Sequence, residues 1–364
     1  MARKIPWWEP RMTGAEYGLV KEVLDSNFLN DGDVTTRFEQ ELASLLGVRH
    51  VVAVTSGTMA IAVALAAVGV RAGDEVIVPD VTFIATANAV ALLGATPVLV
   101  DIDPATLNID PAAVERARTS RTRAVVPVHV SGRAADMAAL VEWGTRHGVA
   151  VVEDAAEAFT SRWRGRCLGT IGALGCFSFS PNKTITTGQG GAVVTDDAAL
   201  HGRLRELKDH GRPARGTGGD DLHPSLGFNF KLTNLQAAVG LAQLSELKPR
   251  LERAKQIYSG YAEGLRGVPG ISLPGFRVDE GETPQWVDAI VERRDDLDRH
   301  LRERNMHCRR FWFPIHRQTP YLQPDDAFPH STAMTARAMW LPSAFTMTDD
   351  DVAAVCSAIR DCLR

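Results

Sequence analysis

The stretch CFSFSPNKTITTGQGGAVVT, residues 176–195, carries more information about the fold than any other part of this chain. Aromatic residues and serines alternate at its start, which predicts one strand, and residues 192–195 predict a second. Lys183 therefore lies on the loop between two strands, ahead of glycines that let another group approach the backbone closely. An amine held there and partly shielded from water loses its proton more readily, as a Schiff-base lysine requires.

Two other interpretations of this stretch have to be weighed. Most lysines on loops are solvated surface groups, and local sequence alone does not separate Lys183 from them. A Walker phosphate loop is the second alternative, but there the lysine follows the glycines, whereas Lys183 precedes them. The order of these residues disfavours a nucleoside triphosphate site.

The chain upstream of this stretch has a sequence pattern typical of a parallel sheet. Short runs rich in Val and Ile recur with helix-like segments between several of them, as expected of strands buried on both faces. Ligands bind at the carboxyl ends of the strands in such sheets. The predicted strands cover residues 51–54, 75–78, 97–100, 124–128 and 149–152, and helices are predicted before them at 14–25 and 34–46.

Three of these strand ends carry candidate ligand-binding residues. Gly57 and Thr58 follow the first strand and precede an alanine-rich helix, so their N–H groups can bind an anion, or the segment is an ordinary helix cap. Phe83 follows the second strand and can present an aromatic face to a planar ring, or pack in the core. Asp154 and Glu157 follow the fifth strand, where a carboxylate is a helix cap or a catalytic group.

A second, smaller α/β unit is predicted towards the C-terminus. Residues 233–265 have helical spacing with an interruption at Pro249. Beyond it the pattern predicts strands at 285–291 and 308–315 and helices at 294–304 and 348–363. The N-terminal segment that contains Trp7 and Trp8 is irregular.

Composition narrows the class of protein further. The chain has 364 residues, a net charge of −4 and 45% apolar residues, so charge gives no reason to expect binding to nucleic acid or membranes. The five cysteines have no paired CxxC spacing, which favours free thiols in a reducing cytoplasm. No signal peptide, membrane-spanning run or metal-binding spacing of histidines is evident, so we expect a cytoplasmic protein without a metal site.

Several motifs together resemble one known family. The segment NKTITTGQGG at 182–191 is similar to the cofactor-lysine segment of the DegT/DnrJ/StrS sugar aminotransferases, and most of all to their perosamine synthase branch. Further similar segments follow in the family's order along nearly the whole chain: SGTMA at 56–60, GDEVIVPDVTFIATANAV at 73–90, EDAAEA at 153–158, GFNFKLTNLQAAVGLAQL at 227–244 and RRFWFPIH at 309–316. Several motifs in order are more specific than any one of them.

The resemblance implies an architecture. We expect an α/β protein with the type I fold of pyridoxal phosphate (PLP) dependent transferases. Its large domain, with a mainly parallel sheet, would cover residues 1–249 and a smaller C-terminal α/β domain residues 250–364. It also implies a homodimer with shared active sites.

The resemblance also implies roles at the cofactor. Lys183 would form the Schiff base, and Asp154 would keep the ring nitrogen protonated. Glu157 stands where relatives more often have Gln in contact with the ring hydroxyl. Ser178, together with Gly57 and Thr58, would hold the phosphate, and Asn229 would reach the phosphate in the partner subunit.

Three substrate contacts are weaker predictions. Arg212 and Arg215 lie in a long Gly-, Pro- and charge-rich loop and can meet a diphosphate, although a solvated loop is the simpler interpretation. His316, in the motif FPIH, is either a substrate contact or a structural histidine.

The expected activity is therefore transfer of an amino group from L-glutamate to a keto sugar, in amino-sugar and polysaccharide biosynthesis. The NKTITTGQGG similarity favours a nucleotide-linked 4-keto-6-deoxyhexose, with a 3-keto sugar, a ketocyclitol or an 8-oxo-octulosonate as alternatives. A sugar dehydratase with His in place of the lysine is disfavoured by Lys183, as is a non-catalytic regulator. A nicotinamide oxidoreductase is disfavoured because no GxGxxG follows an early strand. A cysteine desulfurase is disfavoured because Cys308 lies in a predicted strand.

Overall fold

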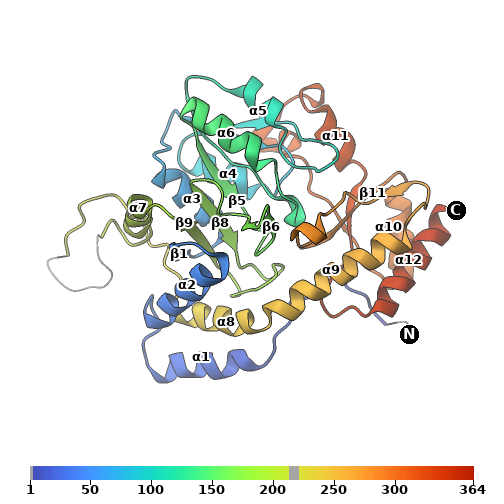
Figure 1. Ribbon diagram of the computed structural model, residues 1–364, viewed down its shortest axis with the longest axis horizontal. Helices are drawn as coiled ribbons and strands as arrows, with labels where there is room; N and C mark the ends of the chain where they lie inside the picture. The colour runs from blue at the N-terminus through green and yellow to red at the C-terminus, as the bar shows by residue number, and fades with distance from the viewer. Residues whose placement is uncertain (1–2, 213–220) are drawn as a thin grey trace.

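The computed structural model describes residues 3–212 and 221–364 and is built around a seven-stranded sheet (Figure 1). Six of its strands run in one direction, and β9, antiparallel to both neighbours, is the exception. The strand order is β1-β9-β8-β5-β4-β2-β3. The strands are β1 (His50–Val54), β2 (Glu75–Pro79), β3 (Thr96–Val100), β4 (Thr122–Val125), β5 (Ala150–Asp154), β8 (Leu174–Ser178) and β9 (Gly191–Thr195).

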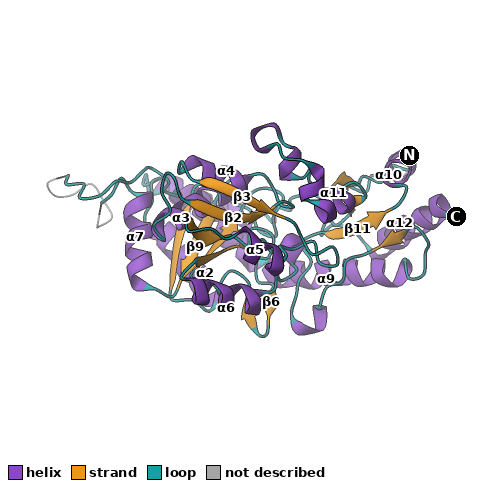
Figure 2. Cartoon of the chain, turned by 90° about the horizontal axis from the view of Figure 1, so that it is seen from above, coloured by secondary structure: helices purple, strands orange, loops and turns teal. Residues whose placement is uncertain are grey.

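Helices cover both faces of this sheet, which explains why its strands are rich in Val and Ile (Figure 2). One face packs against α3 (Gly57–Ala67), α4 (Ala85–Leu92) and α7 (Ala198–Lys208). The other packs against α2 (Asp33–Leu46), α5 (Pro111–Ala117), α6 (Met137–His147) and α8 (Asn234–Ser245), and α1 (Ala15–Asp25) lies on α8. Every one of the five parallel strands predicted upstream is present, with bounds that shift by a few residues.

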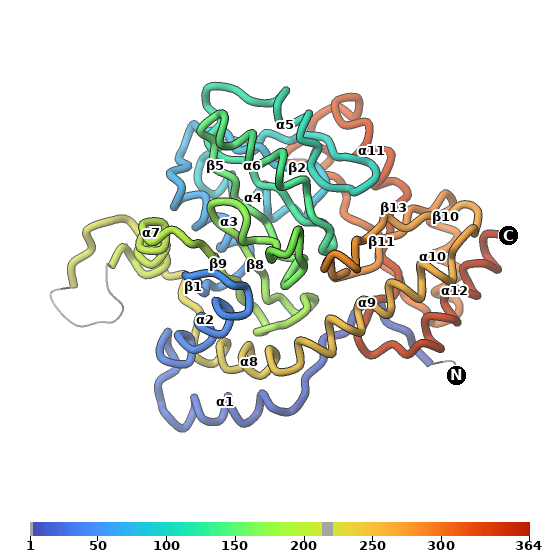
Figure 3. Tube along the Cα trace, viewed as in Figure 1, coloured from blue at the N-terminus to red at the C-terminus, as the bar shows by residue number. Residues whose placement is uncertain are grey.

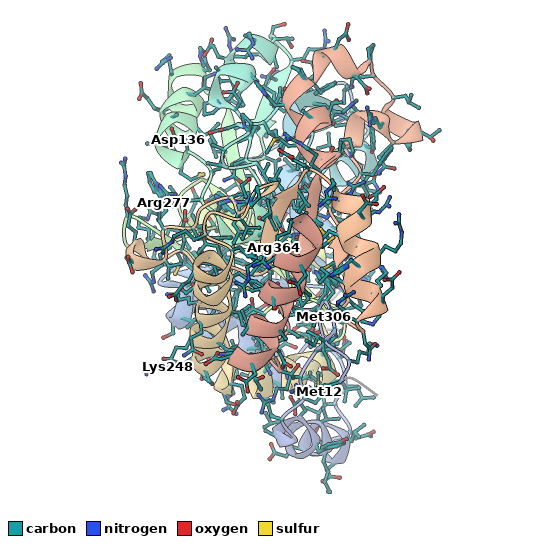
Figure 4. The ribbon with its side chains drawn as sticks, turned by 90° about the vertical axis from the view of Figure 1, so that its right-hand side faces the viewer. Met12, Asp136, Lys248, Arg277, Met306 and Arg364 are labelled. Atoms are coloured by element: carbon teal, nitrogen blue, oxygen red, sulfur yellow. The ribbon has the colours of Figure 1, made fainter. Side chains whose placement is uncertain are left out.

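A four-stranded antiparallel sheet forms the C-terminal unit, in the order β10-β11-β13-β12. Its strands are β10 (Ile271–Ser272), β11 (Val287–Val291), β12 (Arg309–Arg310) and β13 (Ala338–Leu341). One face packs against α9 (Leu247–Gly264), α10 (Arg294–Glu303) and α12 (Asp349–Leu363). Figure 4 shows α9, which begins near Lys248, beside α12, which ends near Arg364.

The other face of the small sheet packs against the large unit. Its tryptophans, Trp286 and Trp340, share an apolar cluster with Val81, Ile102 and Val128, which follow strands of the large sheet. This contact places the small sheet beside the carboxyl ends of the parallel strands. The helix α11 (Pro329–Thr335) and the hairpin of β6 (Arg162–Trp163) and β7 (Arg166–Cys167) complete the α-helices and strands of the described residues.

The N-terminal segment belongs in space to the C-terminal unit. Ile5 pairs with Met306 and lies in the apolar cluster of α9, α10 and α12. The two ends of the chain accordingly lie on the same side of the molecule (Figure 3).

Two predicted elements differ from the structure. The strand predicted at 308–315 is reduced to β12, because the chain beyond it leaves the sheet and Pro314, which has no N–H, precedes a short 3-10 helix at Ile315–Arg317. The helix predicted across 233–265 is broken at Glu246, between α8 and α9, and not at Pro249. This proline lies in the first turn of α9, where a missing N–H costs little. The expected domain division at 249/250 falls within α9 and stays a prediction. None of the helices in the described residues is both long and apolar enough to cross a bilayer.

Candidate active site

A cavity of about 300 Å³ opens at the carboxyl ends of β5 and β8, below the small sheet. This is the edge at which a parallel sheet binds its ligands. Most of the residues singled out in the sequence line it together. They are Gly57, Thr58, Phe83, Asp154, Glu157, Ser178 and Lys183.

The N-terminus of α3 forms the anion-binding side of this cavity. Ser56 caps the helix by accepting a hydrogen bond from the Met59 N–H at 3.2 Å. A Cβ at Gly57 would lie 2.8 Å from the Cβ of Ser178, so glycine is required for the helix to come this close to β8. The Ser178 hydroxyl lies 2.9 Å from that of Ser180. Free N–H groups, a helix dipole and two hydroxyls suit a phosphate.

Asp154 provides a carboxylate at the floor of the cavity. It is 5% exposed, and its oxygens accept hydrogen bonds from the Thr86 hydroxyl at 2.9 Å and the Ala156 N–H at 3.1 Å. Burial raises the pKa of this carboxyl, although both hydrogen bonds and the charge of Lys183 act against the rise. A buried carboxylate of this kind is stabilised by a cationic ligand group, such as a protonated ring nitrogen.

Lys183 lies on the loop between β8 and β9, as predicted, and contacts a second carboxylate. Its Nζ is 3.3 Å from Oε1 of Glu157 and 5.0 Å from the ring centre of Trp286. The other oxygen of Glu157 accepts a hydrogen bond from the Ser131 N–H at 3.0 Å. Burial raises the pKa of Glu157, and the charge of Lys183 opposes this. The site thus holds two buried carboxyls and one amine, and of these the Lys183 amine and Glu157 are in direct contact.

Phe83 lies at the mouth of the cavity and is 55% exposed, so it is not a core residue in this chain. Its ring is free to stack on a planar ligand. Its role at a cofactor stays a prediction.

The remaining predicted residues do not line the cavity. His316 is fully buried, and its ring nitrogens contact Asp80 at 2.6 Å and Asp325 at 3.1 Å. Asn229 is exposed and forms an isolated bridge with Asp209. Their functional roles stay predictions.

The loop arginines also lie elsewhere. Arg212 forms an ion pair with Asp221 at 2.6 Å, away from the cavity, and Arg215 lies outside the described residues.

Sequence reasoning missed part of the lining. Ser56, Ser180, Arg309 and Trp312 lie within quoted motifs but were not singled out. The helix-cap preference for serine is a signal that could have identified Ser56. Trp286, Arg309 and Trp312 come from the small sheet and its continuation. Their sequence spacing carries no sign that the small unit packs over the parallel strands.

Comparison with known proteins shows the family to which this chain belongs. The chain matches the DegT/DnrJ/EryC1/StrS aminotransferase family over residues 10–360 and belongs to it. The predicted family is therefore confirmed, and the protein is an aminotransferase.

Individual relatives narrow the comparison. The chain is 37% identical to the GDP-perosamine synthase of Caulobacter vibrioides over 364 residues, which cover 97% of either chain. It superposes on the crystal structure of 3-amino-5-hydroxybenzoic acid synthase with a TM-score of 0.93 and 30% identity, covering 100% of this chain and 99% of that one. It superposes on DesI, solved in the presence of its TDP-sugar product, with a TM-score of 0.90 and 33% identity, covering 100% and 93%. The predicted fold class, that of the type I transferases, is confirmed.

Proposed function

We propose that this protein is a PLP-dependent aminotransferase that converts a nucleotide-linked 4-keto-6-deoxyhexose into an amino sugar, with L-glutamate as donor. The observation that carries the proposal is the contact of the Lys183 amine with Glu157, beside Asp154 and opposite the N-terminus of α3. The names of two relatives, a GDP-perosamine synthase and an enzyme with a TDP-sugar product, support a nucleotide-linked sugar.

The residues present fit the phosphate, the ring nitrogen and the aldehyde of the cofactor. The α3 N-terminus, with Ser178 and Ser180, would hold the phosphate, since the missing side chain of Gly57 leaves room beside the helix end. Asp154 would hold the proton on the ring nitrogen, and Lys183 would bind the aldehyde carbon. When bound, PLP supplies an electron-poor ring that stabilises negative charge at the carbon undergoing proton transfer.

The protein's own groups account for the proton movements. Lys183 acts as base and acid at the substrate carbon that gains the amino group, because its amine is the basic group that reaches into the cavity. Glu157 orients that amine and is oriented in turn by the Ser131 N–H. Trp286 and Trp312 shield the amine from water on the side of the small sheet.

The expected second subunit belongs to the same proposal. Asn229 is exposed in the single chain, so its side chain is accessible to another copy. In a homodimer it would complete the phosphate site of the partner. Sedimentation of the purified protein, with and without PLP, tests this assembly.

Amination of candidate ketones by parent and Lys183→Ala protein tests the function. GDP- and TDP-linked 4-keto-6-deoxyhexoses are supplied with L-glutamate, beside a 3-keto sugar and a ketocyclitol, and products are identified by mass. We expect a 4-amino product from the parent and none from the variant. Borohydride treatment of the parent should fix the cofactor on the peptide that contains Lys183. Equal turnover by both proteins, or preference for a ketone without a nucleotide, would refute the proposal.

A further inference from the structure

Arg309 is a cationic side chain of the site to which the proposed function assigns no contact with the cofactor or with the catalytic groups. It lies in β12 of the small sheet, is exposed, and lines the cavity together with Trp312. Its guanidinium lies 4.8 Å from the ring centre of Trp7 and 5.3 Å from that of Trp340. A guanidinium carries five N–H donors, and contact with aromatic rings occupies none of them with a carboxylate, so they stay available to an anion.

No carboxylate in the described part of the chain lies within ion-pair distance of Arg309. The adjacent residue differs, because Arg310 pairs with Asp295 at 3.0 Å. Neighbouring residues of a strand point to opposite sides of a sheet, and Arg309 takes the side of the aromatic cluster. Within the described lining, Lys183 is the other cationic side chain, and it contacts Glu157. Arg309 therefore remains free for an anionic part of the substrate.

We propose that Arg309 binds the diphosphate of the nucleotide-linked substrate, an inference that rests on the proposed function. The reacting ketone has to reach Lys183, whose side chain is 12% exposed, whereas Arg309 lies at the exposed rim. In a hexose with its ketone at carbon 4, the diphosphate on carbon 1 is on the opposite side of the ring. When the ketone lies next to the Lys183 amine, the diphosphate therefore points out of the cavity, towards Arg309 at its rim.

The amino donor is the rival occupant of this position. The α-carboxylate of L-glutamate is attached to the reacting carbon and has to stay near Lys183, but its second carboxylate could extend to Arg309. Both anions suit the paired N–H groups of a guanidinium. The two half-reactions distinguish them, because each uses one of the two substrates.

The N-terminal segment takes part in this site, which explains the paired tryptophans in a stretch without regular structure. The Trp7 ring contacts Arg309 and lies 5.4 Å from Trp286, which in turn contacts Lys183. Trp8 donates a hydrogen bond to the carbonyl of Pro181 on the Lys183 loop at 3.3 Å. Trp7 is thus a positioning residue that holds the guanidinium above the cavity.

Direct binding tests the proposal without catalysis. GDP and dTDP are titrated calorimetrically into PLP-loaded parent, Arg309→Gln and Arg310→Gln proteins. Loss of a charge-assisted contact predicts a dissociation constant about ten- to a hundredfold higher for Arg309→Gln, whereas Arg310→Gln should stay within about twofold of the parent. Arg309→Lys should recover part of the affinity, because it keeps the charge but loses the paired N–H groups. Unchanged binding in Arg309→Gln, or no binding of either nucleotide by the parent, would overturn the proposal.

The half-reactions separate this inference from the proposed function. In Arg309→Gln we expect a raised KM for the nucleotide-linked ketone and an unchanged half-reaction with L-glutamate. An effect confined to L-glutamate, or equal on both substrates, would assign Arg309 another role and overturn the inference. A parent that binds GDP or dTDP through Arg309 but aminates no nucleotide-linked ketone would instead refute the proposed function alone.

Discussion

At the scale of single residues, the site depends on how two buried carboxyls are arranged around one amine. Asp154 and Glu157 are both 5% exposed, and each raises the energetic cost of ionising the other. They differ in their partners, because Thr86 holds Asp154 while Lys183 and Ser131 hold Glu157. In the proposed function, this difference would let Asp154 hold the proton of the ring nitrogen while Glu157 stays with the amine.

Glu157→Gln tests this arrangement through the pH dependence of stability. Burial raises the pKa of Glu157 above the ordinary value of 4.5 in the folded protein. The folded state therefore holds this proton more tightly than the unfolded chain, and the resulting stabilisation is lost as pH rises through the folded pKa. Glutamine has no such proton to lose. The free energy of unfolding of the cofactor-free variant, minus that of the parent, should thus increase in urea titrations as pH rises from the ordinary value of 4.5 through the raised pKa of Glu157. A constant or decreasing difference would show that Glu157 ionises without cost.

Gly57→Ala tests the anion-binding side of the cavity, at the N-terminus of α3. Because the added Cβ would come within 2.8 Å of the Ser178 Cβ, either α3 or β8 has to move. We expect a loss of about 1–3 kcal/mol in unfolding free energy and a weaker affinity for PLP, measured by urea and absorbance titrations. Gly202→Ala in α7 is the control, since its Cβ would meet nothing within 4 Å and should stabilise the helix by up to about 1 kcal/mol. Unaltered PLP affinity in Gly57→Ala would contradict the assignment.

Residues of the site differed in how far the sequence could predict them. Lys183 and Asp154 lie in motifs that combine a strand end with a chemical group, so local pattern and family resemblance agreed. Arg309 lies within the quoted motif RRFWFPIH, but no local pattern singles it out there, because its proposed role depends on Trp7, some 300 residues away in the chain, and on the packing of two sheets. Contacts of this kind are properties of the folded molecule alone.

At the scale of elements, a buried ammonium attaches α7 to the first strand and to α2. Lys208, at the end of α7, is 1% exposed, and its Nζ lies 3.1 Å from both Asp31 and Glu39. The same nitrogen donates a hydrogen bond to the Ala53 carbonyl of β1 at 3.2 Å. This network holds the strand that leads into the α3 N-terminus.

Lys208→Met should therefore be costly. It fills the space but removes the ammonium from Asp31 and Glu39. Because Arg205 still pairs with Glu39 at 3.0 Å, we expect a loss of about 1.5–3 kcal/mol in unfolding free energy. Lys21→Met is the control, because Lys21 is 73% exposed in its pair with Asp25 and should contribute no more than about 1 kcal/mol. Urea unfolding measures both variants. Equal stability of the two would mean that the Lys208 network adds nothing to the fold.

The elements themselves were largely predictable, for a physical reason. Strands buried on both faces and helices with one apolar side leave clear periodic patterns, and these patterns predicted β1 to β5, α2 and α12. The prediction failed at 311–315, where Phe311 and Trp312 pack in the aromatic cluster and Ile315 packs against the large sheet, and none of them lies in a strand. Apolar composition indicates burial there without indicating the partner.

At the scale of the whole molecule, one short segment connects the active site to both sheets. The 3-10 turn at Val130–Gly132 contains Ser131, which is fully buried with a positive φ of 52°. Its N–H binds Glu157, and its hydroxyl donates to Asp288 of the small sheet at 2.7 Å. Arg133, directly after the turn, forms an ion pair with Asp288 at 2.5 Å. A displacement of the small sheet would thus move Ser131 and change its hydrogen bond to Glu157, the carboxylate next to Lys183.

Asp288→Ala tests whether the two units depend on this connection. Asp288 is 1% exposed and Arg133 2% exposed, so the substitution leaves a buried guanidinium without its counter-ion, for which we expect a loss of about 3–5 kcal/mol. Asp295→Ala, which removes a carboxylate that is 59% exposed, should cost no more than about 1 kcal/mol. Urea unfolding is followed by far-ultraviolet circular dichroism and by tryptophan fluorescence, measured in a Trp143→Phe/Trp163→Phe background so that the remaining tryptophans all belong to the aromatic cluster of the small sheet. Because the pair joins the two units, both signals should change at one midpoint in the parent, and in Asp288→Ala the fluorescence midpoint should fall below that of the dichroism. Coincident midpoints in the variant would show that the contact stabilises the molecule as a whole without controlling the cohesion of its two sheets.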